Sequence, residues 1–230
     1  MVCRWISFLT FTLTAFAPLA AAPMPAELAE ALADFRAEGS PHWAFTQVTA
    51  GEGKSLVERY DPSKSNPQHW TLVEKDGHAP SVTDLTKYRE DHAHLNNGLT
   101  APSVKDQIVP DSAELVSDDG TRATWRFRLQ PGGPDDSSAE HMAASFTLHR
   151  PTATIEQVEL ASIEPFSPVF LVKIKEARTT MRYTLPTPEQ PTLLQKVTMR
   201  VRGRAMWFKS VDSDLTVDYR DYAPAGPAVP

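Results

Sequence analysis

Three long segments in succession near the C-terminus constrain the fold more than any other part of this chain. Residues 170–185, 193–208 and 211–222 each alternate apolar and polar side chains, which is typical of a half-buried β-strand. In the middle segment, for example, Val197 and Met199 alternate with charged and polar residues. Strands of this length are expected in one broad antiparallel sheet rather than in a sandwich of short strands.

Two amphipathic helices are expected earlier in the chain. The first covers residues 27–38, where apolar residues recur at i, i+4 and i+7. The second runs over residues 81–95, and Ser81 and Asp84 have the spacing of a capping box at its start. A helix with one apolar face buries that face against another element, so both helices should lie on a sheet.

The remaining apolar segments predict further strands. They cover residues 42–49, 55–60, 69–74, 108–116, 121–130, 142–150 and 152–163. In the last of them the alternation slips between Ile155 and Val158, which predicts a β-bulge. We therefore predict an α+β fold: a large curved antiparallel sheet, forming an incomplete β-barrel, with two helices covering its concave face.

The first 22 residues have the features of a secretory signal peptide. Arg4 precedes a short apolar run, and small residues follow, which places cleavage near Ala21 or Ala22. The alternative is an N-terminal membrane anchor, but the run is short and interrupted by polar residues. The only cysteine, Cys3, lies inside this segment, so the mature chain would have no disulfide, no thiolate metal site and no cysteine nucleophile. We expect a periplasmic or secreted protein that is not lipid-anchored.

The mature chain is expected to form one domain over residues 23–222, followed by a disordered Pro/Ala tail over residues 223–230. No later segment approaches the ~18 apolar residues that a membrane-spanning helix needs, so no transmembrane segment is expected in the mature chain. The net charge of −6 argues against nucleic acid as a partner, because phosphate backbones bind basic surfaces.

The order of these elements resembles that of the periplasmic lipoprotein carriers, the LolA-like and LolB-like proteins. The shared layout is a signal peptide, an amphipathic helix, strands, a helical insertion and long meandering strands, and it spans nearly all of the mature chain. In that superfamily an incomplete antiparallel barrel curls around an apolar cavity that helices cover. The resemblance therefore implies the shape of this protein and suggests a lipid or acyl ligand.

The inward faces of the strands provide the candidate ligand-binding residues. Strand alternation would direct eight large side chains to the concave side: Trp125, Phe127, Phe170, Val172, Met181, Tyr183, Met199 and Trp207. Aromatic and methionine side chains together suit adaptable binding of an acyl chain. The alternative is that they form a filled core beneath the helices.

No pattern in the chain predicts catalysis, a metal or a cofactor. There is no nucleophile elbow, no phosphate-binding glycine loop and no H-E-x-x-H motif. His92 and His94 would diverge by about 200° on a helix and so could not share an ion. The arginines at 200, 202 and 204 fall on the face opposite the apolar residues, as expected for a solvated convex face.

We therefore expect an exported protein that holds a lipid or acyl group non-covalently in an apolar cavity and performs no reaction on it. Two alternatives stay open. One is a structural or interaction domain of the cell envelope, which would have a filled core and could bind another envelope protein. The other is a hydrolase with an unrecognised site, which would have a polar cleft with convergent carboxylates or histidines.

Overall fold

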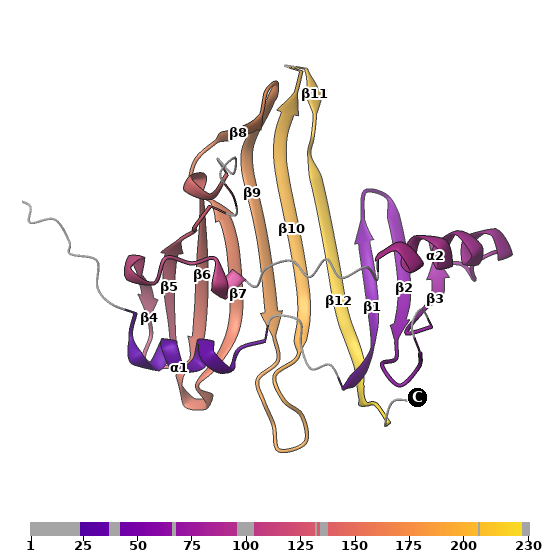
Figure 1. Ribbon diagram of the computed structural model, residues 1–230, viewed down its shortest axis with the longest axis horizontal. Helices are drawn as coiled ribbons and strands as arrows, with labels where there is room; N and C mark the ends of the chain where they lie inside the picture. Colours follow the sequence, from indigo (N-terminus) through magenta and orange to yellow (C-terminus); the bar gives the residue numbers. More distant parts are fainter. Residues whose placement is uncertain are drawn as a thin grey trace, which may run out of the picture.

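The computed structural model describes residues 24–36, 42–65, 68–95, 104–131, 133, 138–206 and 208–226. The predicted signal peptide and Trp207 lie outside these residues. The structure is dominated by one antiparallel sheet of twelve strands (Figure 1). The strands follow the order β3-β2-β1-β12-β10-β9-β7-β6-β5-β4, and two short strands are added at the side, β8 on β9 and β11 on β10.

The bounds of the elements agree broadly with the alternation in the sequence. The strands are β1 (Trp43–Gly51), β2 (Lys54–Tyr60), β3 (Trp70–Lys75), β4 (Glu114–Asp118), β5 (Arg122–Arg128), β6 (Met142–His149), β7 (Thr154–Ser162), β8 (Phe166–Val169), β9 (Val172–Tyr183), β10 (Leu194–Ala205), β11 (Lys209–Ser210) and β12 (Ser213–Pro224). The helices are α1 (Ala26–Asp34), α2 (Val82–Leu95) and the short 3-10 turns η1 (Val104–Asp106), η2 (Pro110–Ser112), η3 (Ala139–His141) and η4 (Arg150–Thr152).

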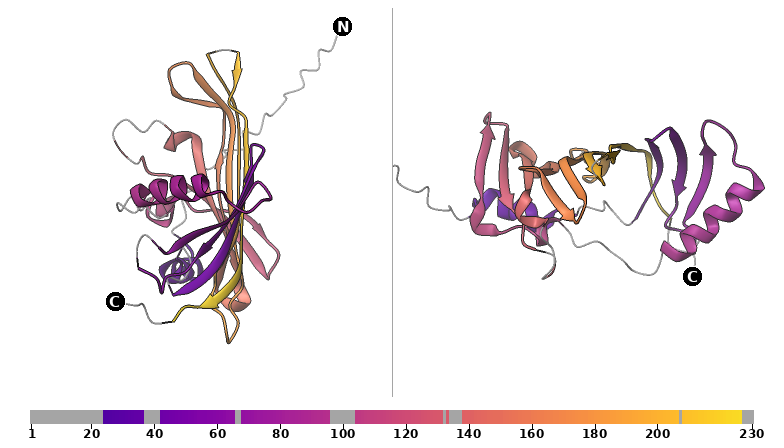
Figure 2. Two further views of the ribbon diagram at one scale, coloured as in Figure 1. Left: turned by 90° about the vertical axis from the view of Figure 1, so that its right-hand side faces the viewer. Right: turned by 90° about the horizontal axis from the view of Figure 1, so that it is seen from above.

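The sheet is curved, and both α-helices lie on the same side of it (Figure 2). The helix α1 lies over the end of the sheet that contains β5, β6 and β7, and α2 lies at the other end, beside β3 (Figures 1 and 2). The outermost strands, β3 and β4, do not pair with each other, so the sheet is not closed. The predicted α+β fold, with an open curved sheet and two helices on one face, is confirmed.

The helix α1 is shorter than predicted. It ends at Asp34, because Phe35 adopts an extended conformation with φ −68° and ψ 130°. This turn of the backbone places the Phe35 ring edge-on against Tyr183 of β9, with 5.0 Å between ring centroids. Packing of this aromatic pair therefore ends the helix before Gly39, where the sequence predicted the end.

The predicted capping box begins α2. The Ser81 hydroxyl accepts a hydrogen bond from the Asp84 amide at 3.1 Å, and the Asp84 carboxylate accepts one from the Ser81 amide, also at 3.1 Å. Asp84 also pairs with Lys75 at the end of β3. Hydrogen bonds from Lys75 and Ser81 lower the pKa of Asp84 from 3.8 to about 2. These interactions therefore stabilise the folded state above pH ~4, and their contribution is lost as the pH falls toward 2.

The main hydrophobic core lies between α1 and the strands beneath it. It consists of buried side chains from α1, its C-terminal extension, the segment between η1 and η2, β5, β6, β7 and β9: Leu28, Ala31, Leu32, Phe35, Ile108, Ala123, Trp125, Phe127, Ala144, Phe146, Leu148, Ile155, Val158 and Tyr183. The predicted bulge is present here. Gln157 pairs with Thr147 but Ile155 pairs with Leu148, so Glu156 is the extra residue. The bulge lets both Ile155 and Val158 point into the core.

Three predicted boundaries are wrong. The predicted strand at 108–116 is interrupted by η2, because Pro110 cannot donate to a strand ladder, and only β4 remains as a strand. The strand predicted from residue 170 begins at Val172. At the other end, β12 continues to Pro224, which pairs with Trp43 of β1, so the first two residues of the predicted disordered tail are strand. Residues 227–230 of that tail lie outside the described residues.

The convex face carries cross-strand ion pairs. Arg200 and Arg202 of β10 both contact Asp214 of β12, at 3.3 and 2.6 Å. A similar ion pair joins Lys196 to Asp218 at 3.0 Å across the same two strands. Opposite charges in facing positions are the expected pattern of a solvated sheet surface. This agrees with the solvated face predicted for the arginine stripe.

The two faces should differ strongly in their sensitivity to substitution. Phe127→Ala should lower the free energy of unfolding by about 3–5 kcal/mol, because the ring is 1% exposed in the core. Arg200→Ala should change it by less than ~0.5 kcal/mol, because the side chains of Arg200 and Asp214 are both more than half exposed. Urea unfolding of both variants measures this difference. Equal losses would contradict the assignment of the faces.

Candidate functional site

Cross-strand register identifies the residues that share the concave face. Residues directly opposite each other in an antiparallel pair point to the same side. The pairing places one row on the side of α1, running from β5 through β6, β7, β9 and β10 to β12: Trp125, Phe146, Val158, Met181, Val197 and Val217. A second row, two residues along, runs through the same strands: Phe127, Ala144, Leu160, Thr179, Met199 and Leu215. These rows carry the apolar character of the sheet from one end toward the other.

The middle of this face differs from the α1 end. Over β9, β10 and β12, between the two α-helices (Figure 2), the same rows are only half-buried, and Met199 is 38% exposed. We use the name central trough for this part of the concave face, formed by Thr179, Met181, Val197, Met199, Val201, Leu215 and Val217. It is a surface of methionine and branched aliphatic side chains, bordered by a helix at either end.

The structure separates the eight predicted ligand-binding residues. Trp125, Phe127 and Tyr183 lie in the core, at 4%, 1% and 5% exposure, and they face α1 and Phe35 rather than an open cavity. They share a face with the trough, but α1 fills the space above them, so their assignment to an open cavity is wrong.

The other five predicted residues lie in three different places. Met181 and Met199 belong to the central trough, and Val172 lies further along β9 on the same side. Phe170 is not on the concave face at all, because it sits in the turn between β8 and β9 and is 90% exposed. Trp207 falls outside the described residues.

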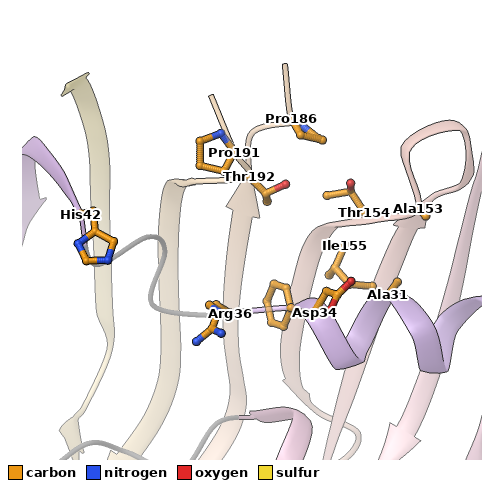
Figure 3. Close-up of a pocket in the computed structure, with 11 residues that line it drawn as sticks. Ala31, Asp34, Arg36, His42, Ala153, Thr154, Ile155, Pro186, Pro191 and Thr192 are labelled. Carbon is orange, nitrogen blue, oxygen red and sulfur yellow. The ribbon is translucent and has the colours of Figure 1, made fainter. Parts of the chain in front are cut away.

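A cleft of about 690 Å³ opens at the end of the sheet where α1 stops (Figure 3). Apolar side chains line one part of it, including Phe35 and Ile155. Figure 3 shows the prolines of the β9–β10 connection, Pro186 and Pro191, above this part, with Arg36 and His42 to the other side. The cleft therefore offers apolar contacts at one end of the long strands, together with charged ones from Arg36 and from the carboxylate of Asp34.

Beneath α2, the same face of the sheet carries a polar site that the sequence analysis did not identify. Glu58 of β2 is 5% exposed. Among the described residues, it is the one ionisable carboxylate that is buried. Its carboxylate accepts hydrogen bonds from the Gln47 amide at 3.0 Å and from the Tyr88 hydroxyl at 2.8 Å. His92 Nε2 lies 3.6 Å from the same carboxylate. We refer to Gln47, Glu58, Tyr88 and His92 as the Glu58 cluster.

A group of packed aromatic rings adjoins this cluster, and its Trp70 lies 6.1 Å from the His92 ring, measured between ring centroids. The rings come from β1, β2, β3 and β12: Phe45, Tyr60, Trp70, Tyr219 and Tyr222. His92 stacks on Tyr88 with 3.9 Å between ring centroids. Burial, followed by the negative charge of Glu58, raises the pKa of both Tyr88 and Tyr219, so both hydroxyls stay protonated at neutral pH. The protonated Tyr88 hydroxyl remains a donor to Glu58.

The Glu58 cluster is suited to holding α2 on the sheet. Two of its members, Tyr88 and His92, are on α2, and the other two are on β1 and β2. Both carboxylate oxygens of Glu58 already accept hydrogen bonds, so the charge is compensated within the fold. The sequence contains one indication that Glu58 is buried: it lies between Leu56 and Tyr60 in the alternation, on the apolar face of its strand.

Within the described residues, no group of three or more His, Cys, Asp or Glu side chains is arranged to hold a metal ion. Among the described helices, none is long and apolar enough to cross a membrane.

Comparison with known proteins gives no family assignment. No family model and no curated protein matches the chain. Solved structures with some similarity include GphF Dehydratase 1, at 14% identity, 87% coverage of this chain, 82% of that chain and a TM-score of 0.18. A crystallisation variant of the GphF dehydratase gives 15% identity, 86% and 81% coverage and a TM-score of 0.17. TM-scores this low do not indicate a shared fold, and no function is inferred from them.

Removing the Tyr88 hydroxyl should weaken the attachment of α2. Tyr88→Phe should lower the free energy of unfolding by about 1–3 kcal/mol, because a buried carboxylate loses a donor. In a Glu58→Gln background the same substitution should cost less, because the acceptor is then neutral. A double-mutant cycle by urea unfolding gives the coupling. Lys87→Ala on the exposed side of α2 is the control, and identical losses in both backgrounds would rule out action through the carboxylate.

Proposed function

We propose that this is an exported protein that binds a lipid or acyl chain non-covalently on the concave face of its sheet. The observation that supports this is the central trough, an apolar surface left half-exposed between two helices. Met199 lies near the middle of it and Met181 at its border with the core beneath α1, and flexible thioether side chains can adapt to chains of different shape. The segment at residues 1–22 supports export.

Burial of apolar surface would supply the binding free energy. An acyl chain laid along β9, β10 and β12 would remove both its own surface and that of the trough from water, at about 25 cal/mol per Å². The cleft at the end of α1 would suit the polar end of such a ligand, since Asp34, Arg36 and His42 line it beside apolar residues. Polar groups beside an apolar surface match the two parts of an amphiphile.

We propose binding without catalysis. The carboxylate of Glu58 accepts hydrogen bonds from Gln47 and Tyr88 beneath α2, and it does not line the cleft at the end of α1. A general acid or base must reach the substrate within hydrogen-bonding distance. The arrangement of Glu58 suits a structural role for this charge.

A second candidate function is an interaction domain of the cell envelope that binds no small ligand. The filled core beneath α1 favours it, since Trp125 and Phe127 are fully covered there. In that case the central trough would be the surface available to an envelope protein. The two candidates differ in whether a free acyl compound occupies the trough.

The test is a titration with a long-chain fatty acid. Binding should give a saturable heat signal in isothermal titration calorimetry and raise the melting temperature, because a ligand that binds only the native state stabilises it. Met199→Glu should weaken binding at least ~10-fold, because it places a charge on the apolar floor. The matched control is Thr198→Glu, the same side chain on the opposite face, between Lys196 and Arg200. It should bind as the unsubstituted protein does.

Absence of a saturable signal over several chain lengths would reject the acyl-binding proposal and leave the interaction domain. Equal weakening by both glutamate substitutions would show that the concave face is not where the ligand binds.

A further inference from the structure

The ends of β9 and β10 farthest from the β9–β10 connection carry a cluster of exposed apolar side chains. We refer to it as the apolar tip, formed by Val169, Phe170, Leu171, Met206 and Phe208. Phe170 is 90% exposed and Phe208 is 81% exposed. Figure 1 shows that this end of the long strands, with β8 and β11, projects beyond the neighbouring strands β7 and β1. Large aromatic rings on a projecting turn are costly to leave in water, which points to a function for them.

The tip is built from two turns that are joined to each other. One connects β8 to β9 and the other connects β10 to β11. The Met206 amide donates a hydrogen bond to the Leu171 carbonyl at 2.8 Å, which links the turns. Leu171 and Met206 both have positive φ, 68° and 48°, a conformation that glycine adopts without strain. The turns therefore place large apolar side chains where a smaller residue would fit the backbone better.

Cations surround the tip although the chain as a whole is acidic. Residues 164–176 and 202–212 contain five cations and three carboxylates, a local excess of positive charge, whereas the net charge of the chain is −6. Four of these cations are exposed around the tip, Lys173, Lys175, Arg204 and Lys209, with Asp212 beside Lys175 and Arg204. Positive charge is thus concentrated directly behind the apolar side chains.

The pairing of these cations differs from that of the convex face below them. Along β10, Arg200 and Lys196 face carboxylates on β12. At the tip, Arg204 lies directly opposite Lys173, a cation facing a cation. Facing like charges destabilise a sheet unless an anion lies between or beside them. This arrangement favours an external anionic partner.

We propose that the apolar tip docks the protein on an anionic lipid bilayer. Phe170, Leu171 and Phe208 would enter the boundary between headgroups and acyl chains, and the four cations would contact the anionic headgroups. Exposed apolar side chains with basic residues next to them are the combination that drives interfacial membrane binding. This surface is separate from the central trough, so the proposal does not depend on acyl binding there.

The shape of the tip favours a bilayer over a protein partner. A stable protein interface buries roughly 800 Å² on each side, over a broad and complementary surface. The tip is instead a narrow projection of two adjoining turns (Figure 1), and its cations belong to the strands β9, β10 and β11 that these turns connect. A bilayer accepts such a projection without a complementary pocket, and charge supplies the preference for anionic lipid.

The test is co-sedimentation of the protein, as recovered from the cells that export it, with lipid vesicles. One set of vesicles is phosphatidylcholine alone, and the other contains phosphatidylglycerol as well. The protein should bind the anionic vesicles more strongly, and added salt should reduce this preference. The double variant Phe170→Ser, Phe208→Ser should weaken binding to anionic vesicles at least ~10-fold, because both inserted rings are lost. Lys173→Gln with Arg204→Gln should remove most of the preference for anionic lipid.

The matched control replaces exposed apolar residues elsewhere, Val82→Ser with Leu115→Ser, and should bind as the unsubstituted protein does. All the substituted side chains are on the surface, so melting temperatures should be little changed and loss of binding cannot be ascribed to unfolding. Met199→Glu should leave vesicle binding intact. The proposal is overturned if anionic vesicles do not bind the protein better than neutral ones. It is also overturned if the tip variant binds as the control does, or if Met199→Glu abolishes sedimentation while the tip variant does not.

Discussion

The structure depends on the cross-strand register of its three longest strands, β9, β10 and β12. Each is 12 residues long, and together they join the two ends of the sheet. Their pairing aligns Met181, Val197 and Val217, so that apolar side chains share one face and charged side chains share the other. A slip of one residue would turn the apolar row outward, and neither helix could then be placed as it is. The curved, two-sided sheet and the positions of α1 and α2 follow from this alignment.

The two ends of the concave face are covered by different helices, through apolar contacts at one end and polar contacts at the other. At the α1 end, leucines and Phe35 of the helix region fill the space above Trp125 and Phe127, as in an ordinary core. At the α2 end, the contact is polar, with Glu58 held by Gln47 and Tyr88 among aromatic rings. The strands between them are left half-exposed. Two firmly attached ends and an apolar middle are the arrangement on which the proposal of acyl binding rests.

Much of this could be predicted from the sequence, because it depends on local patterns. Strand alternation indicates which residues share a face, the Ser81 and Asp84 spacing indicates a capped helix, and the slip between Ile155 and Val158 indicates a bulge. Which part of a face is covered depends on where a distant helix packs. Trp125 and Met199 have the same pattern and point to the same side, yet α1 covers only Trp125.

Other features could not be predicted because a tertiary contact decides them. Phe170 continues the alternation of β9 in sequence, but the pairing of β8 with β9 places it in a turn. Glu58 resembles any strand carboxylate until α2 brings Tyr88 to it. The position of Glu58 on an apolar face indicated that it is buried. Its hydrogen-bond donor Tyr88 could not be predicted, because Tyr88 lies 30 residues further along the chain.

The central claim is that the middle of the concave face, and not either covered end, binds an apolar ligand. The most direct measurement is photo-crosslinking with a fatty acid that carries a photoreactive group, followed by mass spectrometry of the labelled peptides. We expect saturable labelling of the strands that form the central trough, around Met181, Met199 and Leu215, with competition by unlabelled fatty acid. Labelling that is confined to the apolar tip, or that competitor does not reduce, would contradict it.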